Sequence, residues 1–157
     1  RTRIAIIAGD SEYSVTHERM RGALKALHDA GLQLAGEARF GPWEAEWGRA
    51  AARLLLNDGA AFDAVICQND VLARGCIEEL ERNGCRVPQD VAVIGHDNSP
   101  DYVSYAHPLL TSIDDNNEML GRQAALCLLD AIAGHPHHGV ERVPVKLIQR
   151  ESTLPLD

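Results

Sequence analysis

DAVICQNDVLARGCIEELERNGCRVPQDVAVIGHDN, residues 63–98, is the stretch that decides the fold. Two short apolar runs, Ala64–Cys67 and Val91–Gly95, lie on either side of a helical pattern. Continuous aliphatic runs of this kind are typical of strands buried in a parallel sheet. The runs stop at polar clusters, Gln68-Asn69-Asp70 and His96-Asp97-Asn98. Because ligands of open α/β sheets bind beyond the carboxyl ends of the strands, the two clusters predict a pocket for a polar ligand.

The same alternation of strands and helices extends through most of the chain. It predicts an α/β fold, a three-layer α/β/α sandwich with a parallel sheet, because strands joined by helical crossovers pair in parallel. Gly31, Asp58-Gly59 and Gly84 are the expected helix ends. The expected strands are Arg3–Ala8, Leu32–Phe40, Ala64–Cys67 and Val91–Gly95, and the expected helices are Ser14–Ala30, Trp43–Asn57 and Val71–Asn83.

The pattern changes after Asp97. Residues 98–108 are loop-like, Leu110–Ile113 is a short extended piece, and Val143–Ile148 alternates partially, as a strand does. Between them, Met119–Ala133 is apolar on nearly every face. A helix of that kind needs cover on more than one side, so this segment is expected to pack against more than the sheet predicted here.

Composition excludes some classes of function. The chain has 157 residues, 45% hydrophobic and 24% charged, a balance typical of one globular domain. Its net charge of −8 disfavours a nucleic-acid-binding surface, which needs clustered Lys and Arg. No apolar run is long enough to span a bilayer, and no secretory signal opens the chain. The abrupt start, Arg1-Thr2-Arg3 before a strand, indicates a cut into a longer protein or a processed N-terminus.

The cysteines and histidines give no strong metal or disulfide motif. Cys67, Cys76, Cys85 and Cys127 have neither C-x-x-C spacing nor a paired His motif, so reduced thiols in a reducing cytoplasm are expected. The histidines of GHPHHG, residues 134–139, fit no helical two-ligand spacing, and a solvated surface turn is expected there. No metal or cofactor is therefore predicted.

Catalytic and nucleotide-binding motifs are also missing. The sequence contains no G-x-S-x-G, no G-x-x-x-x-G-K-[ST] and no G-x-G-x-x-G. Asp114, Asp115 and Glu118 resemble a set of paired carboxylates, but acidic residues at the start of a helix are an ordinary dipole preference.

Asn69 and Asp97 are the strand-end residues expected to contact a ligand, since two polar strand ends at one sheet edge are hard to explain by capping alone. Asp70 is instead expected to be the N-cap of the following helix. Arg19 lies near the same edge and could bind ligand hydroxyls or a carboxylate, although periodicity alone favours a surface charge paired with a neighbour such as Glu18. Trp43 also lies near this edge, where core packing and ligand contact are about equally compatible with the sequence.

Several motifs together resemble the LacI/GalR family of bacterial transcriptional regulators. They are NDVLARG (69–75), RVPQDVAVIGHDN (86–98), PLLTSID (108–114) and VKLIQREST (145–153), preceded by IIAGD (6–10) and HERMRGALKALHDAGL (17–32). Each motif is weak alone, but their order and spacing are specific, and the resemblance covers essentially the whole chain. It implies a periplasmic-binding-protein-like effector domain of two α/β lobes with a small molecule, usually a sugar or nucleobase, between them.

The resemblance also implies particular ligand contacts. The arginine of the R-x-x-G stretch is Arg19, the asparagine of the N-D pair is Asn69, and the aspartate at the G-x-D strand end is Asp97. The aromatic that typically stacks on the ligand falls at Trp43, and the polar residue after the crossover strand falls at Asp115. Where the family often has Tyr or Phe before the strand-end aspartate, this chain has His96, which could tune the pocket or its response to pH.

The chain departs from the family in what it lacks. It has no helix-turn-helix headpiece and no hinge helix, so it should not bind operator DNA itself. We assign residues 1–113 to the C-terminal lobe, 114–141 to a crossover helix and turn of the N-terminal lobe, and 142–157 to a returning strand and tail. Because the sheet that helix 119–133 should cover is missing, we expect this helix to be repositioned, disordered or buried in an oligomer.

The resulting hypothesis is a non-enzymatic effector-binding fragment of a homodimeric LacI-type regulator, in which ligand binding changes DNA affinity in the full-length protein. The alternative is a periplasmic-type sugar receptor on the same fold without a DNA role. A third possibility is an α/β enzyme that uses Asp97 and His96 as an acid–base pair, although no motif supports it.

Overall fold

The computed structural model describes residues 1–59 and 61–154. Six strands form one sheet in the order β2-β1-β3-β4-β5-β6. The strands are β1 (Ile4–Ala8), β2 (Arg39–Phe40), β3 (Ala64–Cys67), β4 (Ala92–His96), β5 (Thr111–Asp114) and β6 (Lys146–Ile148). The helices are α1 (Ser14–Asp29), α2 (Ala45–Asn57), α3 (Asp70–Arg82), α4 (Pro100–Val103) and α5 (Asn117–Ile132).

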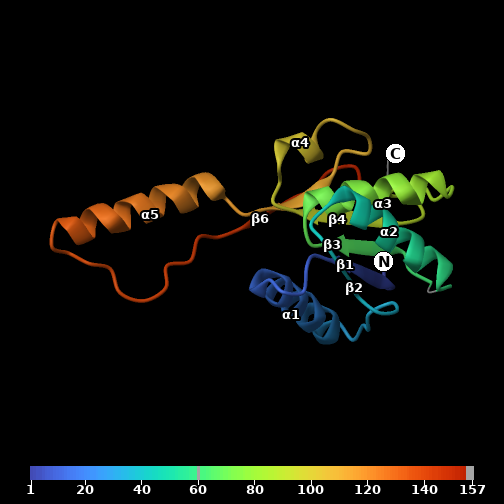
Figure 1. Ribbon diagram of the computed structural model, residues 1–157, viewed down its shortest axis with the longest axis horizontal. Helices are drawn as coiled ribbons and strands as arrows, with labels where there is room; N and C mark the ends of the chain where they lie inside the picture. Colours follow the sequence, from blue (N-terminus) through green and yellow to red (C-terminus); the bar gives the residue numbers. More distant parts are fainter. Residues whose placement is uncertain (60, 155–157) are drawn as a thin grey trace.

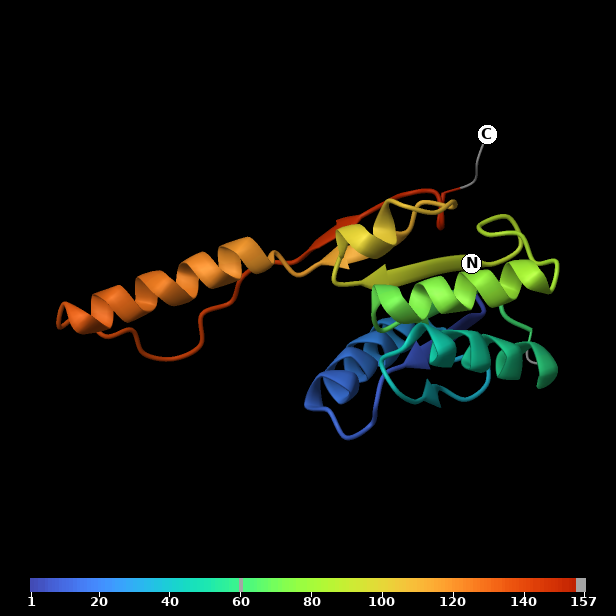
Figure 2. The ribbon, with the colours of Figure 1, turned by 45° about the horizontal axis from the view of Figure 1, so that its top comes forward.

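The body of the molecule is the predicted three-layer α/β/α sandwich, with α1 on one face of the sheet and α2 and α3 on the other (Figures 1 and 2). Successive residues of a strand point to opposite faces, so β1 supplies both layers. Ile6 and Ala8 pack with Met20 of α1, whereas Ala5 and Ile7 belong to the larger core under α2 and α3. The larger core therefore packs strands β1, β3 and β4 against α2 and α3.

The sheet is parallel only as far as β5. Strands β1 to β5 pair in parallel, as predicted, whereas the returning strand β6 runs antiparallel to β5. The physical reason is the path of the chain. It leaves the body after β5, turns at the far end of α5, and must re-enter the sheet in the opposite direction (Figure 1).

Helices α2 and α3 approach each other so closely that two glycines are required between them. A Cβ atom added at Gly48 would lie 2.3 Å from the carbonyl oxygen of Leu72. One added at Gly75 would lie 2.0 Å from the carbonyl oxygen of Ala45. Both contacts are with backbone, which cannot rotate away as a side chain can. Removing the Cβ at these two positions lets the two helix backbones touch.

Two local predictions differ from the structure. The segment 98–108, expected as a loop, contains the short helix α4, which begins at Pro100, a residue favoured in the first turn. The expected strand Leu32–Phe40 reduces to Arg39–Phe40 and one isolated bridge between Leu34 and Ile4. Gly36 has a φ of +77°, which interrupts the extended conformation between these two pieces.

Helix α5 extends away from the body, and residues 134–145, which we call the return segment, run back beside it (Figures 1 and 2). None of the α5 residues, all of which the structure describes, is buried, and Leu128, Leu129 and Ile132 are 60–74% exposed. The expectation of disorder is wrong, because Ala and Leu give this segment a high intrinsic helix propensity. Despite its apolar surface, neither α5 nor any other described helix is long and apolar enough to cross a membrane.

Candidate functional site

Polar residues gather where β1, β3, β4 and β5 end. The backbone turns sharply after β4, because Asp97 and Asn98 have φ angles of +97° and +51°. Positive φ is uncommon for residues other than glycine, and such strain often lies at functional sites. Hydrogen bonds hold the turn: the Asp97 N–H donates to the carbonyl oxygen of Ile113, and the Asn98 N–H donates to Ser112 Oγ. The turn presents Asp97 at the sheet edge.

Arg19 is the centre of the cluster. It projects from α1, and its Nη1 donates to the carbonyl oxygen of Gln68. Its Nη2 lies 3.1 Å from Asp97 Oδ1 and 3.4 Å from Asp115 Oδ2. The Arg19 side chain is only 20% exposed. The pairing with Glu18 that periodicity favours is therefore not what the structure shows, and Arg19 joins α1 to the ends of three strands.

His96 completes this cluster, which we call the Arg19 cluster (Arg19, His96, Asp97 and Asp115). Its Nδ1 lies 3.2 Å from Asp97 Oδ1, and its Nε2 lies 3.5 Å from Asp115 Oδ1. The donor atoms of His96, Asp97 and Asp115 are close enough to suggest a cation site. However, the guanidinium of Arg19 already lies against both carboxylates and would repel a cation. Two carboxylate acceptors beside a guanidinium donor are better suited to a ligand with several hydroxyl groups.

Asn69 has the capping role that was predicted for Asp70. Asn69 is the N-cap of α3: its backbone is extended, and its Oδ1 accepts a hydrogen bond of 2.8 Å from the Leu72 N–H. Asp70 is the first residue of the helix, so its carboxylate is not positioned to cap and the prediction that it does is wrong. The cap uses only the oxygen of the Asn69 amide. Its NH₂ group is the part with which Asn69 could still contact a ligand.

Asp70 instead joins α3 to the chain beyond it. Its Oδ1 accepts from Ser112 Oγ at 2.6 Å, and its Oδ2 accepts from the Ser99 N–H at 2.7 Å. Burial raises the pKa of the Asp70 carboxyl, and the hydrogen bonds from Ser112 and Ser99 oppose that rise. A Cβ at Gly95 would lie 2.3 Å from Asp70 Oδ1, so the carboxylate fits only over a glycine. Asp70 thus supports the position of β5 and of the turn that carries Asp97.

Trp43 lies at the same edge, against the end of β1. The residue is half-buried, and a Cβ at Gly9 would lie 2.1 Å from an atom of its ring. Trp47 stays nearby by donating from Nε1 to the carbonyl oxygen of Ala8 at 3.1 Å. The indole of Trp43 therefore packs on Gly9, directly before Asp10, at the level where β1 ends.

Gln68 is a site residue that the sequence reasoning did not select. It is 3% exposed, and its Oε1 accepts from the Gly9 N–H at 3.2 Å while its Nε2 donates to the carbonyl oxygen of Thr16 at 3.0 Å. These bonds fix the start of α1 relative to β1 and β3, and so fix the helix that carries Arg19. The signal was present, because Gln68 is the first polar residue after an apolar run.

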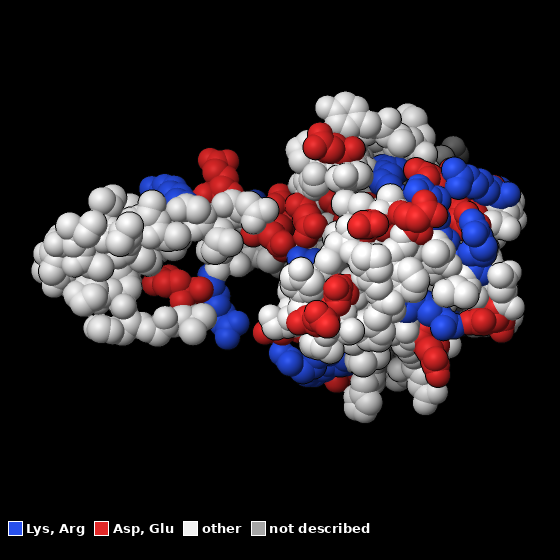
Figure 3. All heavy atoms as spheres, viewed as in Figure 1, with Lys and Arg blue, Asp and Glu red and all other residues white. Residues whose placement is uncertain are grey.

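A hollow of about 330 Å³ lies beside the Arg19 cluster, between α1 and the sheet. Arg19, Gln68 and His96 line its polar end, and the isoleucines of neighbouring strands line the rest: Ile6, Ile66, Ile94 and Ile113. Acidic side chains gather where α5 leaves the body, the place at which Asp114 and Asp115 lie (Figure 3). At this edge of the sheet, acidic side chains therefore surround Arg19, the arginine of the Arg19 cluster.

Comparison with known proteins identifies relatives for this arrangement. Residues 1–153 match the family model of the periplasmic binding protein-like domain. The HTH-type transcriptional repressor CytR of Escherichia coli strain K12 is 36% identical over 157 residues, covering 98% of this chain and 46% of that protein. The HTH-type transcriptional regulator CelR of Thermobifida fusca is 36% identical over 152 residues, covering 96% of this chain and 44% of that protein. The chain therefore spans about half the length of these curated relatives.

Solved structures agree with this relationship. The Lac repressor dimer bound to operator and the anti-inducer ONPF superposes with a TM-score of 0.92 at 30% identity, covering 98% of this chain and 46% of that one. The transcriptional regulator CelR–cellobiose complex gives a TM-score of 0.84 at 35% identity, covering 96% of this chain and 46% of that one. Nearly the whole chain, α5 included, is covered by these superpositions.

The resemblance to LacI-type regulators inferred from the motifs is confirmed by these relatives, all of which are transcriptional regulators. With nearly its whole length matched by one family model, the chain belongs to the periplasmic binding protein-like domain family.

Proposed function

We propose that this chain is the effector-binding part of a LacI-type transcriptional regulator, in which ligand binding changes the affinity of the full-length protein for operator DNA. The observation that carries the proposal is the Arg19 cluster, which joins a guanidinium, two carboxylates and an imidazole at the carboxyl ends of parallel strands. The edge of an open α/β sheet at that end is where ligands bind. The relatives supply the regulatory context.

The ligand class that suits this site is a sugar or a related small molecule with several polar groups, including a nucleobase derivative. Asp97 and Asp115 accept hydrogen bonds from ligand hydroxyls, and Arg19 donates to ligand oxygens. Asn69 donates from its NH₂ group, and Trp43 packs its indole face against the apolar face of a sugar ring. The complex of CelR with cellobiose, a relative at 35% identity, supports a sugar.

We also propose an assignment of the chain to two lobes, which the position of α5 supports. Residues 1–113 form one lobe, residues 114–141 cross to a second lobe, and residues 142–157 return. The support is the exposed apolar surface of α5 on a chain that spans about half the length of its relatives. In this proposal, the remainder of a longer cytoplasmic protein covers α5, and the protein is a homodimer, as the Lac repressor neighbour is.

Regulation then requires only that the ligand bind the two lobe arrangements with different affinity. Such coupling typically amounts to about 1–3 kcal/mol. Asp97 lies on the body and Asp115 on the connection to α5, so a ligand that holds both carboxylates binds one lobe orientation better than another.

The test is a thermal-shift screen of the full-length protein against sugars and nucleobases, since a ligand that binds the folded state raises its melting temperature by mass action. With a hit, Arg19→Ala and Asp97→Ala should abolish the shift. Asn69→Asp keeps the helix cap but removes the amide donor, so it should weaken ligand binding without loss of stability. Glu18→Ala, an exposed neighbour of Arg19 on α1, is the control and should bind normally.

A binding assay with operator DNA separates regulation from simple ligand reception. The proposal requires that the ligand change DNA affinity in the wild-type protein and not in Arg19→Ala. A ligand shift with no effect on DNA binding would instead favour a solute receptor on the same fold. Conversion of the ligand to a product would overturn the non-enzymatic assignment.

A further inference from the structure

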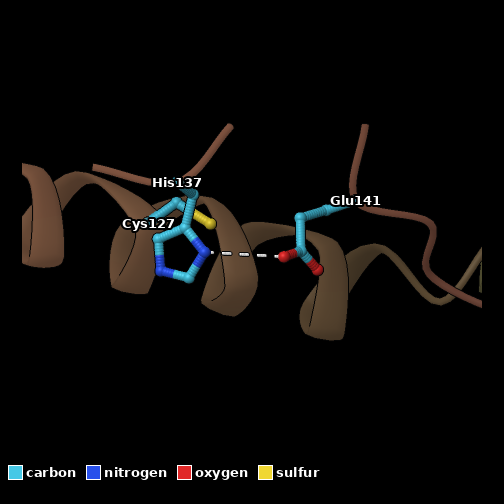
Figure 4. Close-up of side chains that lie close together, drawn as sticks. All are labelled: Cys127, His137 and Glu141. Carbon is cyan, nitrogen blue, oxygen red and sulfur yellow. Dashed lines mark ion pairs between the residues drawn. The ribbon is translucent and has the colours of Figure 1, made fainter. Parts of the chain in front are cut away.

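The return segment carries a second group of metal-ligating side chains, far from the Arg19 cluster. Cys127 projects from α5, while His137 and Glu141 lie on the return segment opposite it. Their ligand atoms, one sulfur, one imidazole nitrogen and one carboxylate oxygen, all lie within 4.8 Å of one another. Figure 4 shows the side chains of His137 and Glu141, from the return segment, close to that of Cys127 on α5.

The distances fit cation ligands better than a hydrogen bond. His137 Nδ1 lies 3.6 Å from Glu141 Oε1, which is too long for a hydrogen bond. Two ligands of a tetrahedral zinc ion, each bonded to the metal at about 2.0–2.1 Å, are separated by about 3.4 Å. The imidazole nitrogen and the carboxylate oxygen are therefore already spaced as neighbouring ligands.

Asp130 supplies the support that a histidine ligand needs. His137 Nε2 lies 2.7 Å from Asp130 Oδ2, one turn of helix along from Cys127. When Nε2–H donates to this carboxylate, the lone pair of a neutral ring lies on Nδ1, the nitrogen that faces Glu141. Histidines that bind metals commonly donate their second ring nitrogen to a carboxylate in this way. Asp130 thus selects the tautomer of His137 that can bind a cation.

An ion pair alone explains less of the arrangement. A protonated His137 between Asp130 and Glu141 would satisfy both carboxylates, but it would leave Cys127 out of the pairing, with its Sγ accepting a long hydrogen bond of 3.9 Å from Gln123 Nε2. Cys127 is half-buried on a helix that is otherwise largely exposed, because the return segment lies over this part of α5. A thiolate, an imidazole and a carboxylate are together the ligand types that zinc prefers.

We propose that Cys127, His137 and Glu141 bind a divalent cation of the zinc class, with Asp130 as a positioning residue and a water molecule as the fourth ligand. Binding removes the proton from the Cys127 thiol and releases it to solvent, so affinity falls at acidic pH. The bound ion joins the return segment to α5. It thereby holds the path by which the chain comes back from the far end of α5 to β6.

The experiment is isothermal titration of the whole 157-residue chain with zinc, together with cobalt(II) as a spectroscopic probe. The expected result is one ion per chain and a near-ultraviolet charge-transfer band that shows thiolate ligation. Cys127→Ser and His137→Ala should abolish the band and the tight binding. Asp130→Asn should weaken binding by about 10- to 100-fold, as loss of a supporting carboxylate does at other metal sites.

Matched controls lie in the same turn and in the same chain. His138→Ala removes a neighbouring histidine outside the group, and His96→Ala removes the histidine of the Arg19 cluster; neither should change the cobalt band. Bound zinc should protect Cys127 from alkylation and leave Cys85, the other half-buried thiol, as reactive as before. Circular dichroism of each variant shows that the fold is retained.

Three outcomes contradict the proposal. One is zinc binding that survives both Cys127→Ser and His137→Ala. Another is binding lost with His138→Ala, which would mean adventitious binding to the histidine-rich turn. The last is binding only at millimolar metal. None of these outcomes would contradict the effector proposal, because the Arg19 cluster shares no residue with the group of Cys127, His137 and Glu141.

Discussion

Replacing Gly75 with alanine should destabilise the protein, although alanine is the better helix former. In a helix without close neighbours, Gly→Ala is expected to stabilise by about 0.8–1 kcal/mol. At Gly75, however, the new Cβ would lie 2.0 Å from the carbonyl oxygen of Ala45. Carbon and carbonyl oxygen normally approach no closer than about 3.3 Å, so α2 and α3 would have to separate by more than an ångström.

The magnitude follows from these opposing effects. Overpacking of a buried contact typically costs about 1–3 kcal/mol, and the upper part of that range applies because the contact is with backbone. Subtracting the helix propensity leaves a net loss of about 2 kcal/mol in the free energy of unfolding. Gly48→Ala, with its Cβ 2.3 Å from the Leu72 oxygen, should behave in the same way.

The assay is urea unfolding of the 157-residue chain, followed by circular dichroism, with the slopes compared so that only the midpoint changes. The control is Gly22→Ala in α1, where no atom lies within 4 Å of the added Cβ. This control should be stabilised by about 0.8–1 kcal/mol. A Gly75→Ala variant as stable as wild type would refute the close approach of α2 and α3.

Three further predictions concern single side chains. Burial raises the pKa of the Asp70 carboxyl. The stability advantage of wild type over Asp70→Asn should therefore be greatest at acidic pH and shrink as pH rises through the folded-state pKa. Urea unfolding across a pH series measures this advantage. Glu151→Gln should show the opposite trend, because the hydrogen bond from the Leu109 N–H lowers the pKa of Glu151. The stability advantage of wild type should be present above the ordinary carboxyl pKa and disappear as pH falls through the lowered value. Asn69→Ala should cost about 1 kcal/mol by removing the cap on Leu72, and Asn69→Asp should restore it; equal loss in both variants would exclude the capping role.

Much of the body was predictable because its signals are local. Apolar runs such as Ala64–Cys67 and glycines such as Gly31 and Gly84 mark strands and helix ends within a few residues. The sheet-edge rule then places Asp97 and Asn69 at one edge without further information. What the rule does not give is which atom each residue uses. Asn69 rather than Asp70 is the N-cap because the helix begins one residue earlier than predicted.

Features that depend on long-range contacts were not predictable in this way. Periodicity alone favoured pairing Arg19 with a neighbour such as Glu18, and only the family resemblance placed Arg19 together with Asp97 and Asp115, to which the structure brings it. The antiparallel direction of β6 depends on where the chain turns at the far end of α5. Cys127 and Glu141 flank the histidine-rich turn at spacings that match no motif, and only the fold of the return segment over α5 brings them together.

The connection formed by β5 and β6 has a mechanical consequence. Strand β5 is held to β4 as far as Ile113, and beyond this point only its antiparallel pairing with β6, Asp114 with Lys146, continues toward α5. A two-stranded ribbon of this kind tolerates larger and more variable twist than a wider sheet. Asp115 lies one residue beyond β5, where this ribbon begins, whereas Asp97 lies one residue beyond β4, in a turn held by the hydrogen bond from its N–H to the carbonyl oxygen of Ile113. We therefore expect torsion of the ribbon to change the distance from Arg19 to Asp115 more than the distance from Arg19 to Asp97. On this expectation, an angular displacement of α5 would break or form the ion pair between Arg19 and Asp115.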